Sequence, residues 1–387
     1  MPLKDRYDYI VTGGGCAGLS FILHVLQAPS LAGKTILLIE KEQNRTNDRT
    51  WCYWEKSSGF FEEIVFRKWD KAWFHGLGYG ALKNLGPYAY KMIRGIDFYN
   101  HCYERMALSG RVDMVHDAVK GIENVDGGVE VRAGNEIFRG EFAFNSILFE
   151  QPVLADSTYY LLQHFKGWII ETKEHVFDPA QPTLMDFRVA QDHGTTFVYV
   201  MPFSATKALV EFTLFTQSLL EQEAYDEGLR HYLKDYLNIT DYTLLEEEFG
   251  VIPMTDHVFP AVNGNIVHLG TAGGQTKPST GYTFRFIQKH VAALVEQLAV
   301  SGNPFLKKSV LHKRFMWYDR VLLHMLFHKK MPGSRIFTLL FSRNPIQRIF
   351  RFLDNETKLT EELILMNTLP QWPFMKAGWK ELINQPS

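Results

Sequence analysis

Three glycines and an acid near the beginning of the chain have the types and spacing of a dinucleotide-binding loop. Gly13, Gly15 and Gly18 form the pattern G-x-G-x-x-G, and a later apolar run ends at Glu40. In such a loop the first glycine makes a tight turn, the second lets the backbone approach a pyrophosphate, and the third lets the following helix pack close to the strand. The carboxylate of Glu40 can accept hydrogen bonds from a ribose diol. These residues predict a dinucleotide cofactor site.

The elements predicted around the loop are those that such a site needs. The apolar residues 9–11 form a strand that runs into the loop, a helix follows Gly18, and residues 36–39 form a second strand that ends at Glu40. A tight strand-to-helix turn without a ligand is the alternative, but the complete series of strand, loop, helix and acid favours cofactor binding. A motif this close to the N-terminus favours FAD over NAD.

Length, charge and cysteine content place the chain in a broad class. At 387 residues it exceeds one average domain, so two interleaved domains are expected. The net charge of −2 gives no indication of nucleic-acid binding, and no feature indicates an oligomeric state. The three cysteines lack C-x-x-C or metal-ligand spacing, so neither a disulfide framework nor a metal site is predicted. We expect a reducing compartment, no secretion signal and no membrane-spanning helix.

Two features of the composition stand out. Aromatic residues make up 14% of the chain, which indicates either a large aromatic core or a cavity for a long apolar ligand. Residues 307–351 contain one acid, Asp319, and a series of basic residues interleaved with apolar ones: Lys307, Lys308, Lys313, Arg314, Arg320, Lys329, Lys330, Arg335, Arg343, Arg348 and Arg351. Short basic amphipathic helices of this kind suit an anionic membrane surface, and they equally suit a helical lid packed on the core with a solvated basic face.

The predicted elements change to antiparallel strands about halfway along the chain. Residues 43–59 are predicted as a polar loop, residues 69–90 lack clear periodicity, residues 92–109 are predicted as a helix, and residues 111–149 as a meander of short strands. Antiparallel strands are then predicted over residues 167–170, 183–189, 195–201 and 208–215, and a helix over residues 219–237. From Asn265 a buried strand, a glycine-rich turn and a helix over residues 282–300 return to the cofactor domain.

Three motifs converge with the N-terminal loop on one protein family. They are the glycine-rich stretch Gly270–Tyr282 preceded by Val251–Met254, the strand-like stretch Leu209–Phe215, and the loop stretch Asp48–Trp54. Together with the C-terminal sequence Leu369–Ala377, they make the chain closely resemble the lycopene beta-cyclase family of carotenoid biosynthesis, in its bacterial flavoprotein branch. The glycine loop alone would fit hundreds of flavoproteins, so the specificity of the resemblance comes from the other motifs.

The resemblance and the order of the elements imply an α/β fold in three parts. A glutathione-reductase-like (Rossmann) FAD-binding domain is expected, interleaved with an α+β substrate domain built on an antiparallel sheet and followed by a helical, basic C-terminal region. The expected bounds are 1–50, 92–150 and 251–300 for the FAD-binding domain, 51–91 and 151–250 for the substrate domain, and 301–387 for the C-terminal region.

Further cofactor contacts follow from the second glycine motif. Close backbone approach to the flavin is predicted at Gly270, Gly273 and Gly274. A helix beginning near Gly281 can point its N-terminal amides at the isoalloxazine. Thr271 stands where many FAD enzymes have an aspartate, a departure that fits the cyclase family. The resemblance places Arg49 near the flavin or the pyrophosphate, and the alternative for Arg49 is an exposed loop residue.

Two glutamates are candidates for proton transfer. Glu211 alternates with apolar residues in a strand-like run, and a carboxyl group among apolar neighbours should have a raised pKa and hold its proton at neutral pH. For an isolated glutamate an exposed strand face would be the better interpretation, but in the family an acid at this position is held essential. Glu248 competes for the role, although Glu246–Glu248 also fits a solvated run of charges.

The resemblance implies conversion of the linear ψ-ends of lycopene into β-rings, through γ-carotene to β-carotene. A proton adds to the terminal double bond, the next double bond attacks the cation, and a ring proton is lost, so the enzyme is an intramolecular lyase or isomerase without net redox change. Family members use reduced FAD, with NAD(P)H as electron donor. The negative flavin can stabilise the carbocation, and Trp51, Tyr53 and Trp54 fit either cation–π contacts or core packing.

Two other functions remain open from the sequence. One is an FAD-dependent monooxygenase or halogenase that acts on an apolar substrate, and the other is a non-catalytic flavoprotein that binds carotenoid or lipid. Because the carotene substrate that the resemblance implies is dissolved in membrane lipid, we expect a cytoplasmic protein associated peripherally with the inner face of the cell membrane.

Overall fold

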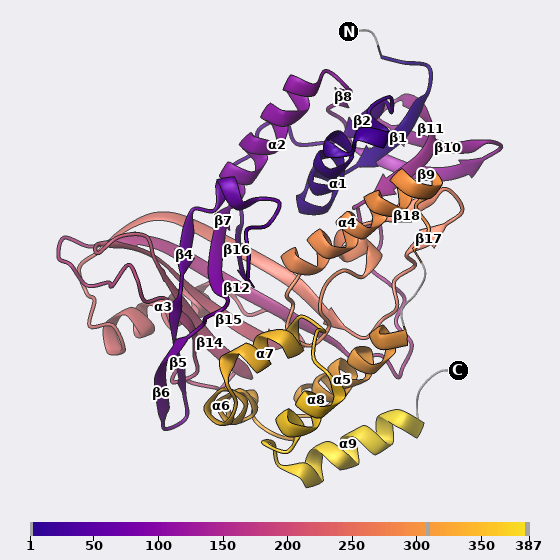
Figure 1. Cartoon of the computed structure of the whole chain (residues 1–387). Coiled ribbons are helices and arrows are strands. Elements are labelled where there is room, and N and C mark those ends of the chain that lie inside the picture. Colours follow the sequence, from indigo (N-terminus) through magenta and orange to yellow (C-terminus); the bar gives the residue numbers. More distant parts are fainter. Residues whose placement is uncertain (1–2, 307–309, 384–387) are drawn as a thin grey trace.

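A computed structural model describes residues 3–306 and 310–383 of the chain. The described residues form two large sheets, a small third sheet and a group of C-terminal helices (Figure 1). The parallel sheet, the antiparallel sheet and the helical C-terminal region that the sequence predicts are all present. Lys307 and Lys308 of the predicted basic region lie outside the described residues.

The first sheet has the parallel core expected of a dinucleotide-binding domain. Its strands follow the order β17 (Val262–Asn263), β18 (Ile266–His268), β11 (Glu136–Asn145), β1 (Tyr7–Thr12), β2 (Ile36–Ile39) and β8 (Val112–Val115). β1 pairs in parallel with β2 and β11, so that Val11 lies between Leu38 and Phe144. β1 and β2 are mostly apolar and almost entirely buried, as is typical of a parallel sheet covered by helices.

Helices and a meander complete this domain. The helices are α1 (Cys16–Gln27), α2 (Gly95–Ser109) and α4 (Phe284–Ser301), and α1 packs against both of the others. Phe21 of α1 stacks on Phe144 of the sheet with ring centroids 3.9 Å apart. The predicted meander is formed by β9 (Val119–Val125) and β10 (Gly128–Ala133), which pair in sequence onto β11.

The second sheet is antiparallel except at one strand pair and carries most of the predicted substrate domain. Its seven strands follow the order β16 (Thr243–Thr255), β12 (Tyr160–Glu171), β15 (Lys207–Thr216), β14 (Thr195–Pro202), β13 (Thr183–Asp186), β5 (Lys71–Gly76) and β6 (Tyr79–Asn84). The helix α3 (Gln222–Asp235) covers one face with Tyr225, Leu229 and Tyr232. β12 therefore lies between β15 and β16, antiparallel to both.

The third sheet corrects the predictions for the first hundred residues. It is built from β3 (Thr50–Glu55), β7 (Ala89–Arg94) and β4 (Arg67–Trp69). β3 lies within the predicted polar loop 43–59, and the predicted helix 92–109 begins only at Gly95 because its first residues complete β7. The run T-W-C-Y-W-E of β3 is rich in aromatic and β-branched residues, which pack well on a pleated surface.

Three predicted domain boundaries also fall inside strands. The boundary 50/51 lies within β3 and the boundary 91/92 within β7. The boundary 250/251 lies within β16, so the antiparallel sheet continues to Thr255. No strand was predicted at β16, because its exposed acids resemble a run of solvated charges. As an edge strand it tolerates those charges on its open side.

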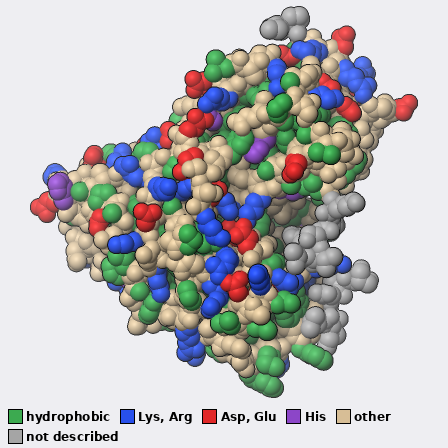
Figure 2. Space-filling view, in the orientation of Figure 1, with side chains coloured by type: hydrophobic (Ala, Val, Ile, Leu, Met, Phe, Trp, Pro, Cys, Tyr) green, Lys and Arg blue, Asp and Glu red, His purple; other side chains and the backbone are tan. Residues whose placement is uncertain are grey.

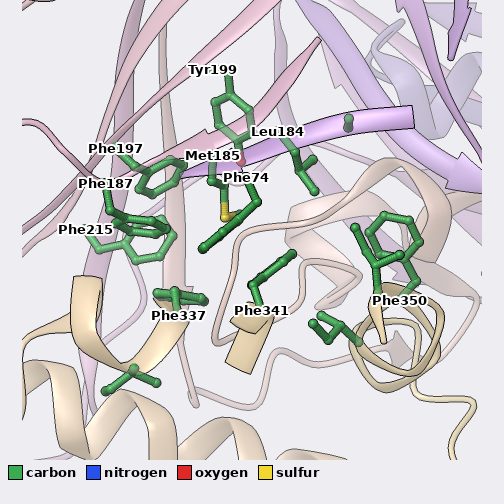
Figure 3. Close-up of a cluster of buried hydrophobic side chains, with 14 of the residues drawn as sticks. Phe74, Leu184, Met185, Phe187, Phe197, Tyr199, Phe215, Phe337, Phe341 and Phe350 are labelled. Carbon is green, nitrogen blue, oxygen red and sulfur yellow. The ribbon is translucent and has the colours of Figure 1, made fainter. Parts of the chain in front are cut away.

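The C-terminal helices cover the second sheet. They are α5 (Val310–Phe327), α6 (Gly333–Arg343), α7 (Ile346–Leu353), α8 (Leu359–Met366) and α9 (Gln371–Ile383). Figure 3 shows the aromatic core beneath them, where Phe337 of α6 stacks on Phe187 with centroids 5.4 Å apart and Phe341 stacks on Phe74 at 4.2 Å. The apolar faces of α6 and α7 are thus buried in the protein, as the helical-lid interpretation of this region requires.

The basic charge of this region is partly neutralised by acids from other segments. Arg314 pairs with Glu362 at 2.8 Å, Arg320 with Glu381 at 2.5 Å, and Arg351 with Glu361. The sequence count of one acid in residues 307–351 could not show these partners, since they lie further along the chain.

Three further observations concern residues 3–306 and 310–383. No helix there has both the length and the hydropathy needed to cross a bilayer. The three cysteines are free. No group of three or more His, Cys, Asp and Glu side chains is arranged to hold a metal ion in that part of the chain.

Candidate active site

A cavity of about 540 Å³ lies where the two large sheets and β3 meet. Residues from four distant segments line it: the glycine loop after β1, strand β3, strand β15 and the motif Gly270–Tyr282. The N-terminal glycine loop and the three motifs that converge with it therefore contribute to one site.

The glycine loop has the backbone geometry that its pattern predicts. Gly13 has φ +93°, and a Cβ atom there would collide with Ser146 Oγ. Gly18 does not line the cavity but lies so close to the carbonyl of Gly13 that no Cβ would fit. At Gly15, the N-cap of α1, no atom lies within 4 Å of the place of a Cβ, so the loop is open toward the cavity.

Glu40 is buried, and its contacts are with the protein itself. It accepts hydrogen bonds from the N–H of Gly14 at 2.5 Å and of Glu42 at 2.9 Å. Arg45 pairs with it at 2.7 Å and also donates to the carbonyl of Gly14 at 2.9 Å. Arg45 thus places a positive charge at the cavity wall beside the glycine loop. It belongs to no sequence motif, so its role was not predicted.

Arg49 lines the cavity at its rim. Its side chain is 58% exposed and lies 3.5 Å from the carboxylate of Asp48. The carbonyl of Arg49 accepts a hydrogen bond from the N–H of Gly95 at 2.7 Å, which ties the loop to the start of α2. The predicted proximity to the cofactor site agrees with this position, while the side chain remains largely in solvent.

The second glycine motif is only partly on the cavity wall. Gly270, Thr271 and Gly281 line the cavity, and Gly270 and Gly281 have φ +63° and +69°. Gly273 and Gly274 are not among the lining residues. Their role is in the turn itself, because a Cβ at Gly273 would collide with the carbonyl of His268 and Gly274 is left-handed at φ +75°.

The two candidate acids meet across a glycine. Gly167 of β12 is the register partner of Glu211 on β15 and also of Glu248 on β16. A Cβ at Gly167 would lie 2.9 Å from Glu248 Cγ, so only a residue without a side chain leaves room for the two carboxyl groups. Glu211 lines the cavity and is half-buried, whereas Glu248 is buried behind it.

Hydrogen bonds and burial set the proton affinities of the pair. Thr213 Oγ1 donates to Glu211 at 2.9 Å, and Thr50 Oγ1 donates to Glu248 at 2.9 Å. Burial raises the pKa of Glu211 well above its usual range, and the neighbouring carboxylate of Glu248 raises it further. Burial also raises the pKa of Glu248 to about 7, although the hydrogen bonds from Thr50 and Glu211 act to lower it.

These shifts favour a proton on Glu211 and a charge on Glu248. Glu248 Oε1 is buried and has no hydrogen-bond partner among the described residues, and a protonated Glu211 would provide one. Two like carboxylates side by side cannot both be ionised cheaply. The pair therefore provides a carboxylic acid at the cavity wall and a carboxylate behind it.

Aromatic side chains form the rest of the wall near the acids. Trp51, Tyr53 and Trp54 of β3 line the cavity together with Tyr199 and Tyr282. The rings of Trp54 and Tyr282 meet edge to face with centroids 4.7 Å apart. An electron-rich, apolar surface of this kind suits a substrate that develops positive charge.

Four residues of this site carry no functional signal in the sequence. Gly167, Thr50 and Tyr199 lie in strands whose pairing cannot be read from one sequence, and Arg45 lies in a polar loop. Thr50 was quoted within the motif Asp48–Trp54, but without a role.

The residues present fit a dinucleotide. The N-terminus of α1 has no side-chain cap, which leaves backbone N–H groups for a pyrophosphate. Gln163 Oε1 and Arg285 Nε on the cavity wall are buried without hydrogen-bond partners among the described residues. Such atoms are polar positions that a bound ligand can satisfy.

Comparison with known proteins identifies the family of the chain. The protein-family model described as "Lycopene cyclase protein" matches residues 8–378. The lycopene beta-cyclase of Paracoccus sp. is 27% identical over 237 residues, which cover 56% of this chain and 58% of that protein. The chloroplastic lycopene beta cyclase of Nicotiana tabacum is 25% identical over 298 residues, 71% of this chain and 57% of its own length. These matches thus span somewhat more than half of each relative.

Solved structures confirm the predicted fold class. A flavoprotein/dehydrogenase from Cytophaga hutchinsonii superposes with a TM-score of 0.65 at 13% identity, over 98% of this chain and 100% of that one. The flavin-dependent brominase Bmp2 gives a TM-score of 0.58 at 14% identity, over 98% and 100% of the two chains. At this identity the likeness shows the fold alone. Because the family match runs through the glycine loop, both candidate acids and the C-terminal helices, the chain belongs to the lycopene cyclase family.

Proposed function

We propose that the protein is an enzyme that converts the ψ-ends of lycopene into β-rings, giving γ-carotene and then β-carotene, with reduced FAD as cofactor. The observation that carries this proposal is the carboxyl pair of Glu211, on the wall of the cavity that the glycine loop also lines, and Glu248, buried behind it. The names of the relatives from Paracoccus and Nicotiana support the same substrate class.

The residues that would hold FAD are those of the two glycine motifs. Gly13 and Gly15 would receive the pyrophosphate at the N-terminus of α1, and Gly270, Thr271 and Gly281 would lie beside the flavin. Reduced by NAD(P)H and bound in its anionic form, the flavin would supply negative charge beside a developing cation. Glu40 and Arg45 hold the loop in the shape that this binding requires.

The chain's own acids account for the proton movements. Glu211 donates its proton to the terminal double bond, which leaves a tertiary cation, and the next double bond closes the ring on it. Loss of a ring proton to the carboxyl pair forms the new double bond and restores the starting protonation. One proton enters and one leaves for each ring, so no electrons are consumed and the reaction is that of an intramolecular lyase or isomerase.

Glu248 promotes both halves of this cycle. Its negative charge raises the proton affinity of Glu211, which keeps Glu211 loaded at neutral pH. After the donation two carboxylates lie side by side, and this repulsion drives the pair to take a proton back from the ring. The aromatic wall of Trp51, Trp54 and Tyr282 excludes water from the cation in the meantime.

Anaerobic turnover separates this proposal from its alternatives. The protein is incubated with lycopene in liposomes, FAD and NAD(P)H without oxygen, and the carotenoids are separated by chromatography. We expect γ-carotene and β-carotene, with no NAD(P)H consumed beyond the reduction of the flavin. Turnover that requires oxygen would indicate a monooxygenase or halogenase, and bound but unchanged lycopene would indicate a carrier. A cytoplasmic location at the inner face of the cell membrane is part of the same proposal, because the substrate is dissolved in lipid.

A further inference from the structure

A second cavity, of about 420 Å³, lies among the C-terminal helices. Its wall is formed mainly by apolar side chains of α5 to α9, including Leu322, Leu340 and Phe374. Tyr282 lines this cavity and the first one. The ring of Tyr282 thus separates an apolar chamber from the site of Glu211.

Helix α9 contributes side chains to the wall of this cavity that are also exposed to solvent. Met375 and Trp379 of α9 line the second cavity, yet they are 63% and 69% exposed to solvent. Trp372, one turn earlier on the same side of the helix, is 78% exposed. The spacing 372, 375, 379 places the three side chains on one face of α9, which we call the α9 face. The α9 face is therefore the rim of the second cavity.

The opposite side of α9 is firmly anchored. A Cβ at Gly378 would lie 2.9 Å from the ring of Trp317, so this glycine lets α9 lie directly on α5. The buried carboxylate of Glu381 pairs with Arg320 at 2.5 Å and accepts a hydrogen bond from Tyr159 at 2.7 Å. The orientation of α9 is thus fixed from within, and its large apolar side chains are held outward.

The charges beside the α9 face are positive. Lys376 and Lys380 are exposed and each follows an exposed apolar residue of the face, while the acid of this helix turn, Glu381, points inward. Figure 2 shows hydrophobic side chains projecting over α9 at the lower end of the molecule. Single exposed apolar residues are ordinary, but two tryptophans and a methionine together at the rim of an apolar cavity mark an interaction surface.

We propose that the α9 face docks on an anionic lipid bilayer and that the second cavity admits one end of the linear polyene from the bilayer toward Tyr282. Tryptophan side chains favour the headgroup region of a membrane, and lysines beside them are attracted to anionic headgroups. The inference rests on the proposed function, because only an apolar, lipid-dissolved substrate needs such a passage. It moves the membrane contact from α6 and α7 of the basic region, whose apolar faces are buried, to α9.

Vesicle binding tests the docking surface without reference to catalysis. The full-length protein is sedimented with vesicles of phosphatidylglycerol and phosphatidylcholine, as wild type, as Trp372→Ser/Trp379→Ser and as Lys376→Glu/Lys380→Glu. We expect each double variant to bind at least about tenfold more weakly. Leu108→Ser is the matched control, because Leu108 is 76% exposed at the far end of the molecule on α2. Equal binding by all four proteins would overturn the proposal.

A second outcome would also overturn it. If the wild type forms a dimer in sedimentation velocity that Trp372→Ser/Trp379→Ser dissolves, and vesicles bind neither protein, the α9 face is a contact between two copies of the chain. Thermal unfolding and near-UV circular dichroism of each variant show whether it has kept its fold, so that weaker binding is attributed to the surface.

Blocking the cavity tests the passage. Leu322 and Leu340 are partly buried on its wall, and Leu322→Trp and Leu340→Trp would fill it while leaving the residues of the first cavity unchanged. We expect the rate of cyclisation to fall at least about tenfold with FAD still bound, since the substrate end no longer reaches the first cavity. Unchanged rates in both variants would overturn the passage. If the wild type does not cyclise lycopene in any preparation, the proposed function fails, whereas vesicle binding still decides the docking surface.

Discussion

Glu211 and Glu248 face each other across Gly167, although their strands are not neighbours. Both residues are in register with Gly167 on the strand between them. Strands in a sheet lie about 4.8 Å apart, so the two Cα atoms are separated by about 10 Å, a span that two glutamate side chains can close over a residue without a side chain. The missing side chain of Gly167 is therefore what turns two distant acids into a pair.

Gly167→Ala should disrupt the pair directly. The added Cβ would lie 2.9 Å from both Glu248 Cγ and Leu209 Cδ1, so the carboxyl groups must move apart. We expect cyclisation to fall about 10- to 100-fold and the unfolding free energy to drop by about 1–3 kcal/mol. Gly33→Ala is the control, because no atom lies within 4 Å of a Cβ at Gly33. Wild-type turnover in Gly167→Ala would show that the contact between the acids is not needed.

Glu248→Gln should change the pH dependence of the reaction as well as its rate. Removing the negative charge lowers the proton affinity of Glu211, so the pH at which activity is lost on the alkaline side should move down. We also expect the maximal rate to fall about 10- to 100-fold. The measurement is the initial rate across the pH range with saturating FAD. Glu246→Gln, at an exposed residue two positions earlier on the same strand, should keep the wild-type profile. An unshifted profile for Glu248→Gln would contradict its assigned role.

The pair should also make the protein less stable as the pH rises. The pKa of Glu248 is raised from 4.5 to about 7 in the folded protein, so between these values the folded state binds more protons than the unfolded state. Stability from this group is fully present below pH 4.5 and is lost as the pH rises through about 7. We expect Glu248→Gln to weaken this decline and to stabilise the protein at pH 8 by on the order of 1–3 kcal/mol, measured by urea unfolding. A steeper decline of the unfolding free energy with pH in the variant would contradict this prediction.

Gly15→Ala tests the cofactor loop without disturbing the fold. No protein atom lies within 4 Å of the added methyl group, and the residue has an ordinary φ of −83°. The unfolding temperature of the FAD-free protein should therefore be close to that of the wild type. The methyl group would occupy the space where a pyrophosphate approaches the loop, so we expect FAD to bind at least about tenfold more weakly. FAD titration with Gly33→Ala as control measures the effect, and wild-type affinity would place the cofactor elsewhere.

The cofactor half of the molecule was predictable because its signals are local. The glycine spacing at residues 13–18, the apolar runs on either side and Glu40 lie within about one βαβ unit, and each residue type has one dominant physical use there. In the structure β2 has the predicted bounds, and the first strand is longer than predicted, from Tyr7 to Thr12. The contacts of Glu40 with Arg45 were not predictable, since nothing in the sequence brings a polar-loop arginine to that acid.

The catalytic half depends on pairings between segments far apart in the chain. Glu211 was identified through the family motif, and Glu248 was predicted as its competitor and not as its partner, within a run, Glu246–Glu248, that also fits solvated charges. The register of β16 on β12 places Glu248 opposite Gly167, and only the packing around the strand shows that Glu248 is buried while Glu246 and Glu247 remain exposed. Gly167 carried no signal for the same reason, since its function exists only between two other strands.

Deuterium labelling is the most direct test of the central claim, that Glu211 starts cyclisation by transferring a proton. The enzyme is equilibrated in D2O and supplied with lycopene, FAD and NAD(P)H without oxygen, and the β-carotene is analysed by mass spectrometry. The account predicts solvent deuterium in the rings formed in the first turnover of the deuterated enzyme, because later rings can receive the proton that the substrate returned to the carboxyl pair. It also predicts no cyclised product from Glu211→Gln with FAD still bound. Cyclised product without deuterium, or wild-type turnover by Glu211→Gln, would contradict it.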